Sequence, residues 1–186
     1  MKLTPQQWAA VEHDGHAVIT ACPGSGKTRT IIARVLKCID ELSGTPRKVA
    51  CITYTNTAVY EIENRIRQHG TSSDKGSYEV STIHAYCQNN ILGNYHWMTD
   101  AYKDGYQVLP PDNDVYKQIV QAIGDCYSLS AYARTQFELL NRRPDGSPIS
   151  SSIPPEAALA FWKELARRGY IDFCNIVYYS YRIVHD

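Results

Sequence analysis

Cys22-Pro23-Gly24-Ser25-Gly26-Lys27-Thr28 is the stretch that decides the fold of this 186-residue chain. It follows a short apolar run, residues 17–21, which is typical of a buried strand. It precedes residues 27–42, whose apolar side chains recur at helical spacing. Glycines allow such a loop to curl until its N–H groups point at phosphate oxygens, and the following helix adds the positive end of its dipole. The sequence therefore predicts a phosphate-binding loop between a strand and a helix.

Lys27 and Thr28 are the candidate catalytic residues of this loop. A lysine at this place can reach the β- and γ-phosphates of a nucleotide, and the following hydroxyl can ligate Mg²⁺. We therefore expect ATP and Mg²⁺ as cofactors, with Thr28 as the metal contact. Ala21 departs from the general pattern, which begins with glycine. The alternative interpretation is a plain glycine-rich turn from strand to helix.

The composition is that of a globular protein. Hydrophobic residues make up 44% of the chain and charged residues 20%, which excludes a disordered or collagen-like chain. Nineteen basic residues balance nineteen acidic ones. No apolar run is long enough for a membrane span or a signal peptide. The six cysteines form no Cys-x-x-Cys pair, so we expect free thiols in a cytoplasmic protein with no membrane partner.

Short apolar runs alternate with helical patterns in the first half of the chain. Residues 49–54 and 78–81 are typical of strands, and residues 56–68 and 83–92 of helices. This alternation favours an α/β fold with a parallel sheet. From Asn94 to about Gly169 the chain is rich in helical patterns and turns, and one more helix is expected over 171–184. We therefore expect a nucleotide-binding half-domain over 1–92, a helical inserted subdomain over 93–169 and a return helix over 170–186.

Three further motifs surround the phosphate loop, in this order: Leu3-Thr4-Pro5-Gln6-Gln7-Trp8-Ala9-Ala10-Val11, Thr53-Tyr54-Thr55-Asn56-Thr57-Ala58, and Ser81-Thr82-Ile83-His84-Ala85-Tyr86-Cys87. With the loop, they resemble the first motifs of superfamily 1 helicases of the UvrD/Rep type. The resemblance covers residues 3–92 and resumes at 170–173. It accounts for Ala21, because alanine is common there in the family. It implies an incomplete RecA-like P-loop parallel sheet with an inserted helical subdomain, single-stranded DNA as a partner, and a setting in DNA repair.

The resemblance also implies an ATP site that extends beyond the loop. Residues 22–28 and Arg29 would hold the nucleotide, and Gln7 would recognise the adenine edge. A local interpretation competes at Gln7. Thr4 as N-cap, Pro5 at the first helical position and Gln7 two residues later form a capping box. One glutamine side chain cannot easily serve both partners.

Four residues match family segments that contact single-stranded DNA: Thr55, Asn56, Thr82 and His84. Hydroxyl and amide groups can bind phosphates, and an imidazole face can stack on a base. The alternatives are structural. Thr55 or Asn56 could simply cap a helix, and His84 could be a satisfied junction residue. The family usually has lysine where this chain has Thr57, which places one phosphate contact in doubt.

Several weaker candidates favour structural roles. Tyr54 and Tyr86 could stack on bases but fit better as core aromatics. Asp172-Phe173 favours helix packing with an aspartate cap over catalysis. Arg142-Arg143 and Arg167-Arg168 could contact a nucleic-acid backbone, although charge pairs on solvated helices are far commoner.

ATP hydrolysis also requires an acidic residue after an apolar strand and an arginine from another domain. The only adjacent Asp-Glu pair is Asp40-Glu41, at the end of the loop helix, and the chain ends at Asp186 before the place where the family carries its own pair. We therefore expect the ATP-binding portion of an ATP-dependent helicase that translocates on single-stranded DNA, inactive by itself. The remainder of the helicase, or a partner subunit, would supply the second motor domain. The alternative is a non-catalytic nucleotide- and DNA-binding subunit that acts through a partner protein.

Overall fold

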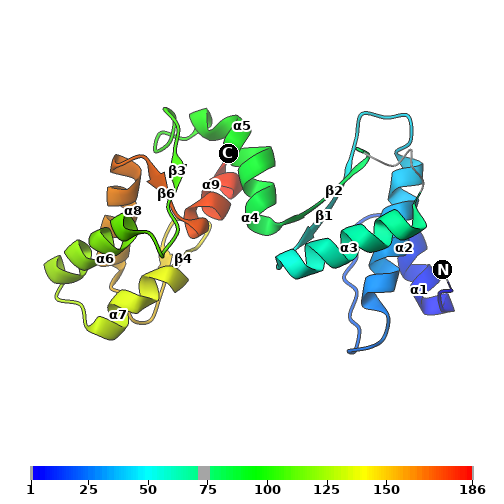
Figure 1. Cartoon of the computed structure of the whole chain (residues 1–186), viewed down its shortest axis with the longest axis horizontal. Coiled ribbons are helices and arrows are strands. Elements are labelled where there is room, and N and C mark those ends of the chain that lie inside the picture. Colours follow the sequence, from blue (N-terminus) through cyan, green and yellow to red (C-terminus); the bar gives the residue numbers. More distant parts are fainter. Residues whose placement is uncertain (1, 71–75, 186) are drawn as a thin grey trace. The chain divides into compact units, whose positions relative to one another are not determined.

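The computed structural model describes residues 2–70 and 76–185, and the chain divides into two compact units, residues 1–83 and 84–186 (Figure 1). The composition suggests a boundary at 92/93 instead. The structural boundary lies earlier because the helical segment 87–92 packs against the last helix of the chain, within the second unit. The predicted division into three segments stays a prediction.

The first unit is built around one parallel β-α-β element. Its helices and strands are α1 (Pro5–Glu12), α2 (Lys27–Glu41), β1 (Val49–Thr53), α3 (Asn56–His69) and β2 (Tyr78–Thr82). The two strands pair in parallel, from Val49 opposite Tyr78 to Thr53 opposite Thr82. Both strands therefore end at the same edge of the sheet, as expected for parallel strands joined through a helix.

The core of this unit explains why α2 and α3 form where the sequence predicts them. Ile32, Val35 and Ile39 recur at helical spacing on α2, and Ile62 and Ile66 do so on α3. All five are buried, and they pack together in one cluster that also includes one face of the sheet. Burying each of these side chains contributes about 1.5–3 kcal/mol. Helix periodicity is thus a reliable signal here because the helices bury one face.

The predicted strand over residues 17–21 is wrong. This segment is not a strand in the structure, and its side chains are not buried: Val18 is 93% exposed and Ile19 50%. β1 pairs with β2 in a two-stranded sheet, and within the described residues no strand pairs with 17–21. A strand needs a neighbour to accept and donate its backbone hydrogen bonds. An apolar run therefore remains irregular when none is present.

The second unit is mainly helical. Its elements are α4 (Ile83–Tyr86, which begins at the boundary), the π-helix η2 (Cys87–Leu92), α5 (Gly93–Tyr95), the 3₁₀ helix η3 (His96–Met98), β3 (Gln107–Val108), α6 (Asp114–Cys126), α7 (Ala131–Thr135), the 3₁₀ helix η4 (Gln136–Leu139), β4 (Asn141–Arg142), β5 (Pro148–Ile149), α8 (Pro155–Arg167), β6 (Tyr170–Ile171) and α9 (Phe173–His185). β3 pairs with β6 in parallel, and β4 pairs with β5 as an antiparallel hairpin. Among the described residues, no helix is both long and apolar enough to cross a membrane.

Aromatic packing between α6, η4 and α8 forms the larger core of the second unit. Phe161 on α8 is fully buried, and its ring meets those of Tyr116 and Phe137 edge-on, with centroids 5.4 and 4.8 Å apart. Edge-to-face pairs of this kind add about 0.5–1.5 kcal/mol beyond the area that they bury. The predicted helical character of residues 93–169 is confirmed, with three two-residue strands in addition.

A second core holds α9 against η2. Leu92, Ile171 and Ile176 are fully buried in it, and the Ser180 hydroxyl donates to the Cys87 carbonyl oxygen over 3.3 Å. Gly93 ends the π-helix. A Cβ at Gly93 would lie 2.5 Å from the Gln88 carbonyl oxygen, so this place requires glycine. The helix expected over 83–92 is therefore present, with its second part wound as a π-helix for packing on α9.

Candidate functional site

The phosphate loop opens onto the N-terminus of α2. The Ser25 N–H donates to the Cys22 carbonyl oxygen over 3.2 Å, and Gly24 and Gly26 have φ values of +76° and +84°. Gly26 is the N-cap residue of α2, and no side chain caps the helix there. The first N–H groups of a helix have no partner within it, and they carry the positive end of its dipole. An uncapped helix start after a left-handed turn is therefore suited to an anion such as phosphate.

Lys27 lies across this loop. Its ammonium donates to the Ala21 carbonyl oxygen over 2.8 Å, while the side chain remains exposed to solvent. A single neutral acceptor leaves two of the three ammonium protons for other partners. Thr28 follows it on the first turn of α2 and is half-buried. The structure thus brings both candidate catalytic residues to the start of α2.

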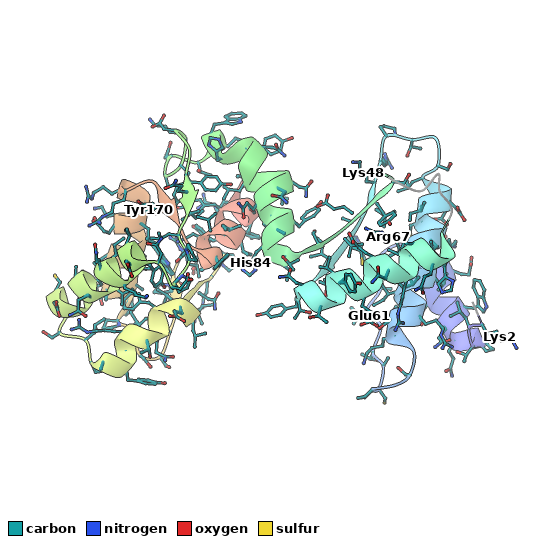
Figure 2. The ribbon with its side chains drawn as sticks, viewed as in Figure 1. Lys2, Lys48, Glu61, Arg67, His84 and Tyr170 are labelled. Carbon is teal, nitrogen blue, oxygen red and sulfur yellow. The ribbon has the colours of Figure 1, made fainter. Side chains whose placement is uncertain are left out.

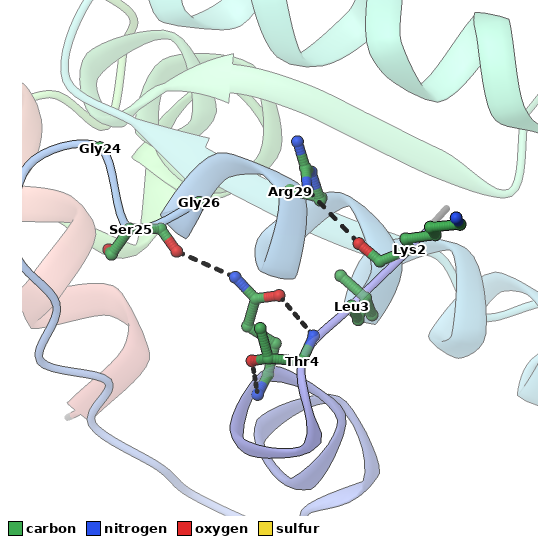
Figure 3. Close-up of a pocket in the computed structure, with 8 residues that line it drawn as sticks. Lys2, Leu3, Thr4, Gly24, Ser25, Gly26 and Arg29 are labelled. Atoms are coloured by element: carbon green, nitrogen blue, oxygen red, sulfur yellow. Dashed lines mark hydrogen bonds between the residues drawn. The ribbon is translucent and has the colours of Figure 1, made fainter.

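Gln7 ties α1 to the phosphate loop. The predicted capping box is confirmed, because Gln7 Oε1 accepts from the Thr4 N–H over 2.9 Å and Thr4 Oγ1 accepts from the Gln7 N–H over 3.3 Å. Gln7 Nε2 also donates to the Ser25 carbonyl oxygen over 2.9 Å (Figure 3). The second contact was not anticipated, since nothing local in the sequence relates Gln7 to Ser25. The same amide group therefore holds both the start of α1 and the phosphate loop.

A cavity of about 400 Å³ lies between the start of α1 and the phosphate loop (Figure 3). Its lining residues are Lys2, Leu3, Thr4, Gln7, Gly24, Ser25, Gly26 and Arg29. Arg29 Nη1 donates to the Lys2 carbonyl oxygen over 3.4 Å at one side. Among the described residues, two cationic side chains and no carboxylate line the cavity. Its volume lies within the usual range of small-molecule sites.

The predicted nucleic-acid residues of the first unit lie at one edge of the sheet. Thr55 caps α3, with its Oγ1 accepting from the Ala58 N–H over 3.2 Å, and Asn56 is the first residue of that helix. Thr82 is the last residue of β2 and lies opposite Thr53, the last residue of β1. Thr55 and Asn56 come just after β1, so all three residues lie at the carboxyl ends of adjacent parallel strands. The cap at Thr55 is confirmed, and the contact with DNA stays a prediction.

The core role that the sequence favours for Tyr54 is wrong. Its side chain is 82% exposed, because β1 ends at Thr53 and α3 begins just after Thr55, which leaves Tyr54 on the connection at the sheet edge. Farther along, α3 carries exposed ion pairs between Glu61 and Arg65 and between Glu63 and Arg67. Figure 2 labels Glu61 and Arg67 on this helix. The aromatic ring of Tyr54 is thus available to an external partner.

His84 belongs to the second unit, on α4 (Figure 2). Its half-buried ring meets Phe173 edge-on, with centroids 5.5 Å apart and an interplanar angle of 77°. Phe173 follows Asp172, whose Oδ1 accepts from the Asn175 N–H over 2.8 Å and so caps α9. The predicted aspartate cap is therefore confirmed. The contact between His84 and Phe173 was missed, because it joins residues far apart in the sequence.

The arginine pairs have partners within the chain. The Arg142 guanidinium lies between the rings of Trp162 and Tyr178, at 4.4 and 4.0 Å from their centroids. Arg167 and Arg168 both bind the carboxylate of Glu164, and these hydrogen bonds lower its pKa to about 2. These contacts agree with the structural roles that the sequence favours.

A left-handed glycine loop and an uncapped helix start, beside a parallel β-α-β element, are typical of nucleotide-binding proteins of the P-loop class. Residues 3–154 match the UvrD/REP helicase N-terminal domain, and the chain belongs to this family. The resemblance seen in the sequence is therefore confirmed. Membership of this family implies the RecA-like α/β fold.

Curated relatives match part of the chain. A probable DNA helicase II homolog of Mycoplasma capricolum is 32% identical over 123 residues, which cover 64% of this chain and 16% of that protein. An ATP-dependent helicase/nuclease subunit of Latilactobacillus sakei is 30% identical over 119 residues, which cover 53% of this chain and 13% of that protein. The corresponding protein of Bacillus cereus is 32% identical over 118 residues, with 53% and 9% covered. The chain thus spans about a sixth or less of the length of these relatives.

Alanine substitutions at the two left-handed glycines test the link between Gln7 and the loop. We expect Gly24→Ala to lower the free energy of unfolding by about 1–2 kcal/mol, since only the positive φ is penalised there. At Gly26 a Cβ would also lie 2.7 Å from Gln7 Nε2. Gly26→Ala should therefore cost about 0.5–1.5 kcal/mol more, the value of one hydrogen bond.

Urea unfolding followed by circular dichroism measures both effects. The control is the Gln7→Ala background, in which the two glycine variants should be equally destabilised. An unchanged difference between them in that background would mean that the bond from Gln7 to Ser25 does not contribute.

Proposed function

We propose that this chain is the ATP-binding portion of an ATP-dependent DNA helicase that translocates on single-stranded DNA. The observation that carries the proposal is the uncapped start of α2. The side chain of Lys27 lies beside it, and the cavity of about 400 Å³ adjoins it. Family membership supports the helicase class. The six free cysteines within the described residues fit the reducing cytoplasm, where a role in DNA repair would lie.

ATP would lie with its phosphates on the loop from Cys22 to Thr28. The ammonium of Lys27 would extend to the β- and γ-phosphates, and the Thr28 hydroxyl would contribute to Mg²⁺ coordination. Both side chains start from the first turn of α2, so they need no movement of the backbone to reach this place. Bound Mg²⁺ neutralises charge on the phosphates.

The adenine base would occupy the cavity beside Gln7 and Arg29. A primary amide has two N–H donors and an oxygen with two lone pairs. Gln7 uses one donor for Ser25 and one lone pair for Thr4. One N–H and one lone pair remain, which is the pair that the edge of an adenine requires. The capping box and base recognition are therefore compatible.

The groups that complete hydrolysis would come from another polypeptide region. The only adjacent Asp-Glu pair is Asp40-Glu41, which ends α2 and does not follow a strand. Glu41 is also engaged with Lys37, at 3.3 Å. We propose that the remainder of the helicase, or a partner subunit, supplies both the metal-binding carboxylates of the Asp-Glu motif and a second motor domain with the arginine for the γ-phosphate.

Single-stranded DNA would bind Thr55, Asn56 and Thr82 at the carboxyl edge of the sheet, together with His84. Ligands of open α/β sheets gather at this edge. The exposed ring of Tyr54 adds a surface on which a base can stack. Hydroxyl and amide groups in the same segment can bind the phosphates between stacked bases.

The alternative function is a non-catalytic nucleotide- and DNA-binding subunit that acts through a partner protein. Two of the relatives are by name subunits of a helicase/nuclease, which favours a role within a larger assembly. Both functions require the phosphate loop. They differ in whether ATP is hydrolysed at this chain's own site.

Lys27→Ala tests the phosphate loop. The variant should bind Mg²⁺–ATP about 10- to 100-fold more weakly, because a hydrogen bond between charged groups contributes about 1.5–3 kcal/mol. Titration calorimetry on the purified chain measures the dissociation constant. Lys117→Ala, which removes an exposed lysine on α6, is the matched control and should bind as the wild type does. Equal affinities for the wild type and Lys27→Ala would show that the loop does not bind phosphate.

ATP turnover tests the missing groups and separates the two functions. We expect this chain alone to hydrolyse ATP far below about 1 s⁻¹, with or without single-stranded DNA. When a second polypeptide that carries the Asp-Glu motif and second motor domain is added, turnover should appear and should be lost in Lys27→Ala. Turnover that survives Lys27→Ala would favour the non-catalytic subunit. Rapid hydrolysis by the chain alone would mean that it contains a catalytic carboxylate of its own.

Fluorescence anisotropy with a labelled oligonucleotide tests the DNA contacts. Single strands should be preferred over duplex, and the affinity should fall with salt. His84→Ala should weaken binding by about 1–3 kcal/mol if the ring stacks on a base, and a Thr55/Asn56/His84 triple alanine variant should weaken it further. His69→Ala, at the other end of α3, is the control. Unchanged affinity of the triple variant at low salt would leave these residues with structural roles only.

A further inference from the structure

We propose that Phe173 is a positioning residue that orients the ring of His84 for its contact with single-stranded DNA. The inference rests on the proposed function, and it adds a role for a residue outside the motifs that contact DNA. It comes from the edge-on contact between the two rings, with centroids 5.5 Å apart.

His84 has little else to fix its orientation. It is the second residue of α4, in the first turn of a helical segment that continues directly into η2. Within the described residues, Phe173 is the ring that contacts it, and no hydrogen bond is made by its imidazole nitrogens. The nitrogens and the ring faces are thus available to a ligand, while Phe173 determines the direction of the ring.

The backbone that carries Phe173 is held in place by the buried residue before it. It is the first residue of α9, and the preceding Asp172 is buried. Asp172 Oδ1 accepts from the Asn175 N–H over 2.8 Å, and Oδ2 accepts from Trp162 Nε1 over 3.1 Å. Each carboxylate oxygen has a donor from a different helix. The first turn of α9 is therefore held to α8 at the residue next to Phe173.

Arg142, which lies on the β4–β5 hairpin, also holds the first turn of α9 in place. Its Nη1 donates to Asn175 Oδ1 over 2.8 Å, and its guanidinium is held between the rings of Trp162 and Tyr178. Asn175 is completely buried. The hairpin, α8 and the start of α9 are thus joined through one cluster of buried polar and aromatic side chains.

α9 and the helix that follows His84 are held together as well. The hydroxyl of Ser180 on α9 donates to the Cys87 carbonyl oxygen, and Leu92 packs against Ile176 in the same core. Both partners of the ring contact are therefore on supported backbone. The contact between Phe173 and His84 has a fixed geometry in the second unit.

Phe173→Leu tests the role, because leucine keeps an apolar side chain and removes the ring. The ring proton signals of His84 in NMR spectra should shift, and single-stranded DNA should bind about two- to tenfold more weakly. Phe173→Tyr should restore both. Tyr181→Leu is the matched control, since it removes the aromatic partner of a different histidine on α9, His185, at 4.3 Å. It should change neither the His84 signals nor the affinity.

A double-mutant cycle shows through which residue Phe173 acts. In the His84→Ala background, Phe173→Leu should have no further effect on DNA affinity. An equal loss in both backgrounds would overturn the proposal, since Phe173 would then contact DNA directly. If His84→Ala alone leaves affinity unchanged, the DNA contact fails, and the NMR signals still decide whether Phe173 orients the ring. Unchanged His84 signals in Phe173→Leu would overturn the inference.

A second variant covers the case in which Phe173→Leu does not fold, as judged by circular dichroism. Trp162→Phe keeps an aromatic ring beside Arg142 and removes the donor to Asp172. It should loosen the start of α9 and shift the His84 signals, with Phe173 still present. Unchanged signals in this variant would contradict the anchoring of Phe173 through Asp172.

Discussion

Positive φ values at Gly24 and Gly26 turn the chain so that α2 starts without a side-chain cap. The rest of the first unit's chemistry depends on this turn, because a residue with a Cβ would resist it and a polar side chain at the N-cap would occupy the free N–H groups. Gln7 then holds the turn through the Ser25 carbonyl oxygen. The shape of the loop is thus set by backbone geometry, and one amide side chain from α1 stabilises it.

The second unit depends on a buried polar cluster instead. Asp172 is removed from water, and burial raises the pKa of its carboxyl group. Hydrogen bonds from Trp162 and the Asn175 N–H oppose that effect, and so does the nearby Arg142. A buried charge is tolerated only when it has such partners. The carboxylate therefore specifies one arrangement of α8, α9 and the hairpin, which a purely apolar core would define less strictly.

The features predicted correctly are those that neighbouring residues determine. Helix periodicity located α2 and α3, and the capping box at Thr4 formed as predicted, because caps and amphipathic faces depend on residues within one or two turns. The segment 17–21 failed because a strand needs a hydrogen-bonding neighbour that the apolar run does not reveal. Tyr54 and the contact between His84 and Phe173 could not be predicted, since exposure and ring pairing follow from how distant segments pack.

The starts of α2 and α3 differ in how well they suit an anion. Both helices belong to the first unit, and each has the positive end of its dipole at its N-terminus. At α3 the Thr55 hydroxyl already accepts from the Ala58 N–H, so the backbone there is partly satisfied. At α2 the N-cap is Gly26, which has no side chain, and the nearby ammonium of Lys27 adds a positive charge. The start of α2 therefore suits an anion better than the start of α3 does.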